Sequence, residues 1–194
     1  MIPQDPIYVV DIIADVVQSV IDDVLDDIQA NETAAIGMAT AIQTINYQYG
    51  HKSELVETLA QMDKTDKAAF QKYPCIYVVQ DFKETIGLTP GFYGAANLNI
   101  IIMHHSQLDY KTTERYANVF KPVLYPIYLS FLTFLSKHAN IITYNPPPKH
   151  DKFDRPLTIV TGKDSAGSLY INDYVDAIEI QNLILTIDSQ TCIN

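Results

Sequence analysis

The sequence has little of what most catalytic and disulfide-stabilised proteins contain. It holds no tryptophan, seven glycines and two cysteines among 194 residues. Two cysteines cannot build a disulfide scaffold, and Cys75 and Cys192 lie too far apart for a metal or redox motif. The glycines form neither G-x-G-x-x-G nor G-x-x-x-x-G-K-[ST], and G-x-S-x-G and H-E-x-x-H are also absent. We therefore predict no catalytic residue, no cofactor and no metal, and we interpret both cysteines as ordinary thiols.

Positive charge is also scarce. Lys and Arg total 13 against 23 Asp and Glu, which gives a net charge of −10, and Arg115 and Arg155 are the only arginines. This balance excludes a protein that wraps nucleic acid by neutralising phosphates. It remains compatible with a negatively charged channel through which DNA slides without sticking.

Long hydrophobic runs are missing as well. An uncharged, aromatic-rich run, Pro122–Leu135, has 14 residues, whereas a membrane-spanning helix needs about 20. The first residues carry no Lys or Arg, so a secretory leader is not expected. We predict a protein made in a reducing compartment, without membrane insertion.

What the chain does have is enough apolar sequence for a single domain over residues 1–194. Apolar residues make up 47% and charged residues 19%, values typical of a folded chain. Helix and strand patterns alternate along it, in about two main helices and six strands. We predict an α+β fold in which a small mixed or antiparallel sheet packs with the two helices.

The clearest helix is predicted over residues 7–29, where polar residues recur every three or four positions. Asp11, Asp15, Asp22 and Asp26 fall on this polar face. We interpret them either as a plain solvated face or as an acidic surface toward DNA or a basic partner.

A second helical region is predicted over Thr112–His138. Pro122 and Pro126 lie inside it, so we expect a short helix to about Phe120 and a kink or restart with Pro122 in a first turn. An aromatic stripe then repeats at helical spacing: Tyr125, Tyr128, Phe131, Leu132 and Leu135. We interpret the stripe as core, with a partner-binding groove as the alternative. A shorter helix is expected over residues 53–59.

Strands are predicted from β-branched and aromatic runs. The segments are 34–49, 73–82 (buried on both faces), 98–104, 141–144, 157–161 and 176–187, and residues 168–172 can return as a further strand. Residues 87–97 are expected to form a loop. Residues 145–156 are expected to form an extended, exposed loop, because they hold three consecutive prolines and a charged run. From this loop we take Pro146, Pro147, Pro148, Lys149, His150 and Lys152 as candidate contacts to a neighbouring chain.

His104 and His105 are the only paired histidines. Adjacent residues of a strand point to opposite faces, so the pair is a poor chelator. We interpret both as structural.

Several segments in this order give the chain a family likeness: Tyr73–Phe82 before a glycine-bearing loop, then Leu98–Ile102, Thr112–Tyr116, Phe120–Tyr128 and Asp173–Leu185. From about Ile36 to Ile187 the sequence resembles the small head-to-tail connector and tail-terminator proteins of tailed bacteriophages. It is most similar to those of phages that infect Bacteroides and relatives, including crAss-like phages. The resemblance transfers no functional residue, and the triple proline and the acidic first helix depart from it.

The resemblance implies an α+β, tail-terminator-like subunit of a sixfold or twelvefold ring in the virion, made in the host bacterial cytoplasm. Such a ring lies between portal or connector proteins and the tail, and DNA passes through its lumen without sequence-specific binding. Asp11, Asp15, Asp22 and Asp26 would then be candidates for the lumen wall. Two alternatives stay open: a soluble bacterial adaptor that binds a partner through the proline loop, and a small metal-dependent enzyme built around His104.

Overall fold

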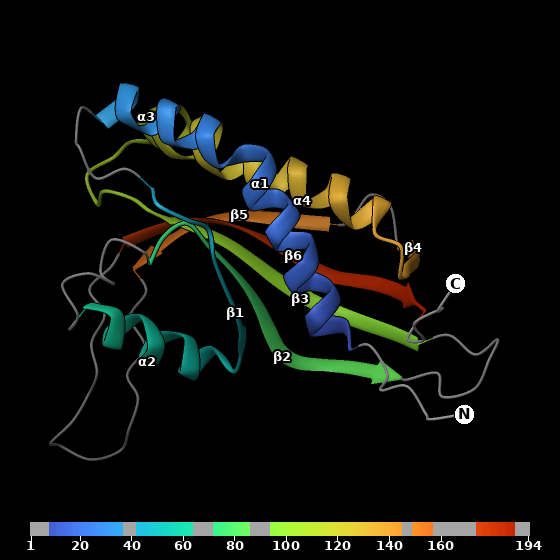
Figure 1. The fold of residues 1–194 in the computed structure, drawn as a ribbon. Helices are drawn as coiled ribbons and strands as arrows, with labels where there is room; N and C mark the ends of the chain where they lie inside the picture. The colour runs from blue at the N-terminus through green and yellow to red at the C-terminus, as the bar shows by residue number, and fades with distance from the viewer. Residues whose placement is uncertain are drawn as a thin grey trace, which may run out of the picture.

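A computed structural model of the chain describes residues 8–36, 42–63, 72–85, 94–144, 149–156 and 174–188. The fold is α+β, as predicted (Figure 1). The helices are α1 (Val9–Ile36), α2 (Lys52–Asp63), α3 (Thr112–Arg115), the π-helix η2 (Tyr116–Leu124) and α4 (Tyr125–Lys137). The strands are β1 (Asn46–Gly50), β2 (Cys75–Thr85), β3 (Gly94–His105), β4 (Ile141–Tyr144), β5 (Lys149–Pro156) and β6 (Tyr174–Ile187).

All these strands belong to one mixed sheet of order β1-β2-β3-β6-β4. The β1–β2 pair is parallel, and β2–β3, β3–β6, β4–β6 and β5–β6 are antiparallel. β4 and β5 pair with successive parts of β6, so together they form one border of the sheet, while β1 forms the other.

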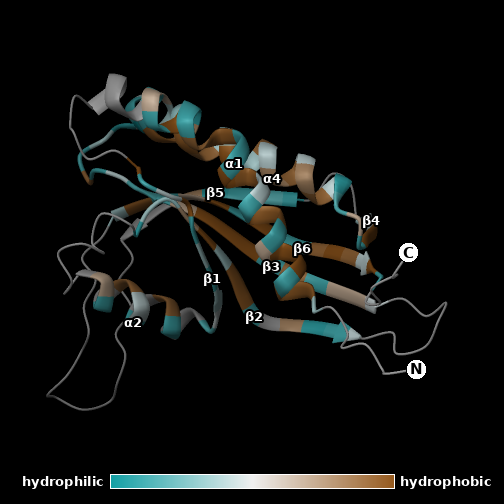
Figure 2. Ribbon diagram, in the orientation of Figure 1, coloured by the Kyte–Doolittle hydropathy of each residue, from teal (hydrophilic) through white to brown (hydrophobic). Residues whose placement is uncertain are grey.

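Helices cover the two faces of the sheet unequally. α1 and α4 lie side by side over one face, and the shorter α2 lies on the other near β1 and β2 (Figure 1). The main core lies between α1, η2, α4 and the sheet, where Ile12, Val20, Phe131, Ile100 and Ile180 are all buried. Figure 2 shows the matching hydrophobic colour on the inner sides of these elements. A second cluster beneath α2 includes Leu59, Tyr77 and Met103.

The amphipathic pattern of α1 is confirmed, but the helix ends later than predicted. The predicted strand at 34–49 is wrong at its start, because residues 34–36 are the last of α1. An Ala-Ala pair with high helix propensity extends the helix there past Asn31. The strand itself begins at Asn46.

The second helical region is one uninterrupted helix from Thr112 to Lys137. The predicted break near Phe120 is wrong, because the chain passes Pro122 inside the π-helix η2. The wider π turn eases the clash between a proline ring and the preceding turn. The α-helical geometry resumes at Tyr125, with Pro126 rather than Pro122 in the first turn.

The strand predictions at 73–82, 98–104, 141–144 and 176–187 are confirmed, and Cys75 to Val79 of β2 are buried as expected for a central strand. The short helix predicted at 53–59 is the middle of α2. The loop predicted at 87–97 is wrong at its end, because Gly94–Asn97 belong to β3. The strands predicted at 157–161 and 168–172 lie outside the described residues.

The predicted loop at 145–156 is also wrong in its second half, because Lys149–Pro156 form β5. This segment has no alternating apolar pattern of its own. Its backbone is held by the border of β6, from Lys149 opposite Gln181 to Pro156 opposite Tyr174. Where β4 gives way to β5, Asn182 of β6 adopts a positive φ of 52°, and its N–H donates to the Asn99 side-chain oxygen at 2.9 Å.

Candidate functional site

A surface hollow of about 210 Å³ lies where β5 meets the helical segment. We call it the β5 hollow, and its lining residues are Thr112, Arg115, Tyr116, Phe120, Lys152 and Phe153. Three aromatic rings and two cations therefore share one small concavity. The π-helix supplies Tyr116 and Phe120, and π-helical turns occur frequently at functional sites.

Lys152 is the fixed cation of this hollow. Its Nζ donates a hydrogen bond to Tyr125 Oη at 2.8 Å and lies 5.5 Å from the centroid of that ring. The same Nζ lies 5.9 Å from the centroid of the Phe120 ring. The ammonium group, on an exposed residue, thus lies close to two aromatic rings, whose faces attract cations through their quadrupoles.

His150 makes the neighbouring contact between β5 and α4. Its Nδ1 lies 3.0 Å from Tyr128 Oη, and the two ring centroids are 4.9 Å apart. His150 and Lys152 are exposed, as predicted, but they lie on strand β5 and not on an extended loop, and both side chains contact aromatic residues of their own chain. Their role as contacts to a neighbouring chain stays a prediction. Lys149 is exposed on β5, and Pro146, Pro147 and Pro148 lie outside the described residues.

The aromatic stripe of α4 is mostly core, as predicted. Tyr128, Phe131 and Leu135 are buried, while Tyr125 and Leu132 are partly buried against the same cluster. Burial raises the pKa of the Tyr128 hydroxyl. Tyr125 is the member of the stripe that reaches the β5 hollow, through its bond to Lys152.

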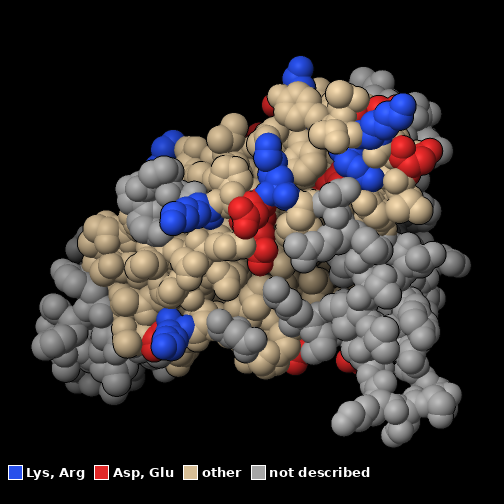
Figure 3. Space-filling view, turned by 180° about the vertical axis from the view of Figure 1, so that it is seen from behind, with Lys and Arg blue, Asp and Glu red and all other residues tan. Residues whose placement is uncertain are grey.

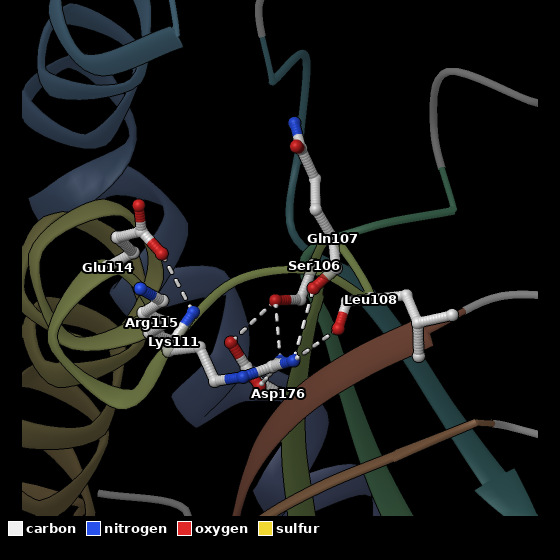
Figure 4. A network of polar contacts seen from close by, with 7 residues as sticks. All are labelled: Ser106, Gln107, Leu108, Lys111, Glu114, Arg115 and Asp176. Atoms are coloured by element: carbon white, nitrogen blue, oxygen red, sulfur yellow. Dashed lines mark hydrogen bonds and ion pairs between the residues drawn. The ribbon is translucent and has the colours of Figure 1, made fainter.

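Behind the hollow lies a buried ion pair that sequence reasoning missed. Arg115 Nη1 lies 2.8 Å from Asp176 Oδ1, with Asp176 fully buried. Ser106 Oγ donates to the other carboxylate oxygen at 2.7 Å and accepts from Arg115 Nη1 at 3.1 Å. Figure 4 shows these side chains converging from β6, α3 and the end of β3.

The guanidinium group has further partners. Its Nη2 donates to the backbone carbonyls of Gln107 at 3.1 Å and Leu108 at 3.3 Å. Its carbon lies 4.6 Å from the centroid of the Tyr174 ring. The network ties the β3–α3 connection to the first residues of β6 and holds Arg115, which is one of the residues that line the hollow. Two signals in the sequence point to it: an aspartate inside an apolar strand, and one of only two arginines.

The predicted acidic face of α1 is exposed as expected. Asp11, Asp15, Asp22 and Asp26 are all exposed, and α1 contains no Lys or Arg. Asp23, beside this stripe, accepts a hydrogen bond from Ser130 of α4 at 2.7 Å. On the far side of the molecule, acidic and basic groups alternate between wide uncharged areas (Figure 3).

The histidine pair and Cys75 lie as the sequence predicts. His104 is buried and His105 exposed, consistent with opposite faces of β3. Cys75 is a buried free thiol in the cluster beneath α2. Burial raises the pKa of this thiol to about 12, which makes it a poor nucleophile at neutral pH. Cys192 lies outside the described residues.

We expect the protein to lose stability in alkaline solution, because the buried thiol and tyrosine hydroxyls have higher pKa values in the folded state than in the unfolded state. Burial, with the Glu54 carboxylate second, raises the pKa of Tyr77 to about 12, and burial also raises that of Tyr47. The folded state then binds more protons than the unfolded state above about pH 9, so the free energy of unfolding falls from there toward pH 12. Urea unfolding at a series of pH values measures this.

A Cys75→Ala variant is the control for the alkaline loss. Without the thiol, whose unperturbed pKa is 9.0, the decline should begin nearer to pH 10, where the tyrosines of an unfolded chain ionise. An identical decline in both proteins would contradict the assignment to Cys75.

No group of three or more His, Cys, Asp or Glu side chains is arranged to hold a metal ion within the described residues. One helix, Thr112–Lys137, is long and apolar enough to cross a membrane by length and composition. More than half of its most apolar window is buried inside the protein, as in core helices.

Comparisons with protein-family models, curated proteins and solved structures found no match.

Proposed function

We propose that this protein is a structural subunit of a ring in the head-to-tail connector or tail of a tailed bacteriophage. The proposal combines the likeness to connector and tail-terminator proteins with an α+β architecture of the kind that likeness implies. In this role the protein is a virion component that contacts portal, connector or tail proteins, and DNA passes through its ring.

The acidic stripe of α1 is the observation that carries the proposal. The helix has 28 residues, which corresponds to a length of about 42 Å. Four aspartates line its exposed side, and no basic residue in the helix offsets them. A solvated helix face usually mixes both signs of charge, because pairs at i and i+4 stabilise the helix. In α1 a neutral amide, that of Gln18, donates to Asp22 at 3.0 Å, so the stripe keeps its negative charge.

A position on the wall of a ring lumen would explain such an acidic stripe. Repeated around a symmetry axis, the stripes would form a wall of negative potential. DNA phosphates would be repelled from the wall, so the duplex would stay mobile during passage. Neither alternative function gains comparable support. Of the loop in the adaptor hypothesis, residues 146–148 lie outside the described residues and Lys149–Pro156 form β5. His104 has no metal-binding cluster among the described residues.

Native mass spectrometry and negative-stain imaging over a range of concentrations, with and without the portal protein, test the ring. Closed rings of six or twelve copies are the expected result. A protein that forms no ring alone and none on the portal would contradict the proposal.

The lumen assignment is tested by reversing charge on α1. Rings of an Asp22→Lys/Asp26→Lys variant should bind linear double-stranded DNA about tenfold more tightly than wild-type rings, with affinity that falls steeply as salt rises. Fluorescence anisotropy measures this.

A Glu57→Lys/Asp109→Lys variant is the matched control, because both of these acids are exposed on other elements and the change in net charge is equal. Equal DNA binding by the two variants would place the stripe outside the lumen.

A further inference from the structure

We infer that neighbouring copies join through the two borders of the sheet: β1 of one copy pairs antiparallel with β5 of the next, and Tyr49 enters the β5 hollow of that copy. The inference rests on the proposed function, because the ring gives the relative orientation of neighbouring copies from which it is argued. The occupant of the hollow is therefore a second copy of this chain.

The two borders are unlike and lie at opposite ends of the sheet. β1 pairs only with β2, and β5 only with β6, among the strands that the structure describes. A strand at a sheet border presents backbone groups that can pair with another chain. Because the borders differ, pairing one with the other is heterologous, and heterologous contacts close into rings when the rotation permits.

Strand directions make this pairing antiparallel. β2 runs with β1, β3 runs against β2, β6 runs against β3, and β5 runs against β6. β5 is therefore opposite in direction to β1 of the same copy. Neighbours in a ring of six or more subunits keep nearly the same orientation, so β1 of the next copy also runs opposite to β5. Antiparallel pairing of a short strand needs no crossover connection.

The side chains at the two borders fall on matching faces. Tyr49 of β1 is opposite Val78, and Lys152 of β5 is opposite Ile178. Val78 and Ile178 both belong to the core beneath α1 and α4, so Tyr49 and Lys152 project from the same face of the sheet. If the sheet continued from one copy into the next, these two side chains would lie on the same face of the sheet, at the boundary between the two copies.

Tyr49 and the hollow also match chemically. Tyr49 is 59% exposed, a large apolar area for a side chain on a sheet border. The hollow offers Phe120, Tyr116 and the ammonium group of Lys152, which is already aligned with aromatic faces. A third ring next to Lys152 would extend this cation–π arrangement. Buried aromatic anchors of this kind dominate protein–protein interfaces.

Crosslinking of variants that carry one introduced cysteine besides the buried Cys75 tests the contact. In a Cys192→Ser background, Tyr49→Cys and Lys152→Cys proteins are treated with a short bismaleimide, each alone and as a mixture. We expect a covalent dimer in the mixture and background levels in either protein alone, because a head-to-tail contact joins position 49 only to position 152. The Tyr49→Cys/Lys152→Cys double variant should give a ladder up to the full ring.

The matched control is Ile184→Cys, which is 49% exposed but lies in β6, inside the sheet. It should give no dimer with Tyr49→Cys. In the same series, Lys152→Glu should raise the concentration needed for ring assembly by about tenfold.

The outcomes separate the two proposals. Rings without the 49–152 dimer, or with equal dimer from the Ile184 control, would overturn this inference and leave the ring function standing. The 49–152 dimer without closed rings would support the contact and overturn the ring function. The absence of both would overturn both.

Discussion

Replacing Asp176 with alanine should lower the free energy of unfolding by about 3–5 kcal/mol. Asp176 is fully buried and is the carboxylate to which Arg115 is paired at 2.8 Å. Removing it leaves a guanidinium group, itself 7% exposed, without its counter-charge. The loss of a buried partner costs more than the pair contributes, because the remaining charge stays desolvated. Urea unfolding followed by circular dichroism measures the change.

Two further variants identify the cause of that loss. Arg115→Met/Asp176→Leu removes both charges and should recover most of the stability, since apolar pairs often replace buried ion pairs without cost. Ser106→Ala removes only a neutral donor to Asp176 and should cost about 1 kcal/mol. If Asp176→Ala unfolded at the same urea concentration as wild type, the ion pair would have no structural role.

Replacing Phe131 with alanine should cost about 3–5 kcal/mol. The Phe131 ring is fully buried in the main core, on the side of α4 that faces α1 and the sheet. Removing it leaves a cavity that rigid helix–sheet packing cannot close completely. The same denaturation measurement applies, at neutral pH, where Cys75 and the tyrosines are protonated.

Leu129→Ala is the control for the cavity effect. Leu129 lies two residues earlier on α4 and is 59% exposed. Its replacement should change stability by no more than about 0.5 kcal/mol. Equal losses at both positions would contradict the cavity effect, because alanine has a higher helix propensity than either residue that it replaces.

The elements that could be predicted are those whose characteristic residue pattern lies within a single segment of the sequence. α1 shows a full amphipathic period, and β2 and β3 are runs of apolar β-branched residues, so both patterns identify their elements without knowledge of neighbours. The exposed acidic stripe and the inert Cys75 follow from the same local reasoning.

The missed features all depend on residues far apart in the chain. β5 has a polar, proline-bounded sequence and becomes a strand through the backbone of β6. The positions of His150 and Lys152 follow from that pairing, so their contacts with Tyr128 and Tyr125 were not visible in the sequence. Arg115 and Asp176 are separated by 61 positions, so the sequence can mark each residue as unusual but cannot show that the two are paired.

The position of β6 has a consequence for how the chain folds. β6 lies between β3 and the β4–β5 border, yet it comes after every other described strand in the sequence. β3, with which β6 pairs, begins at Gly94, 80 positions before β6 begins at Tyr174. Closing the sheet therefore requires a long and entropically expensive loop. During synthesis, the border of β3 that pairs with β6 stays unpaired until Tyr174–Ile187 has left the ribosome. Folding should therefore be slow for a protein of this size, and the nascent chain is most exposed to aggregation just before its last strand docks.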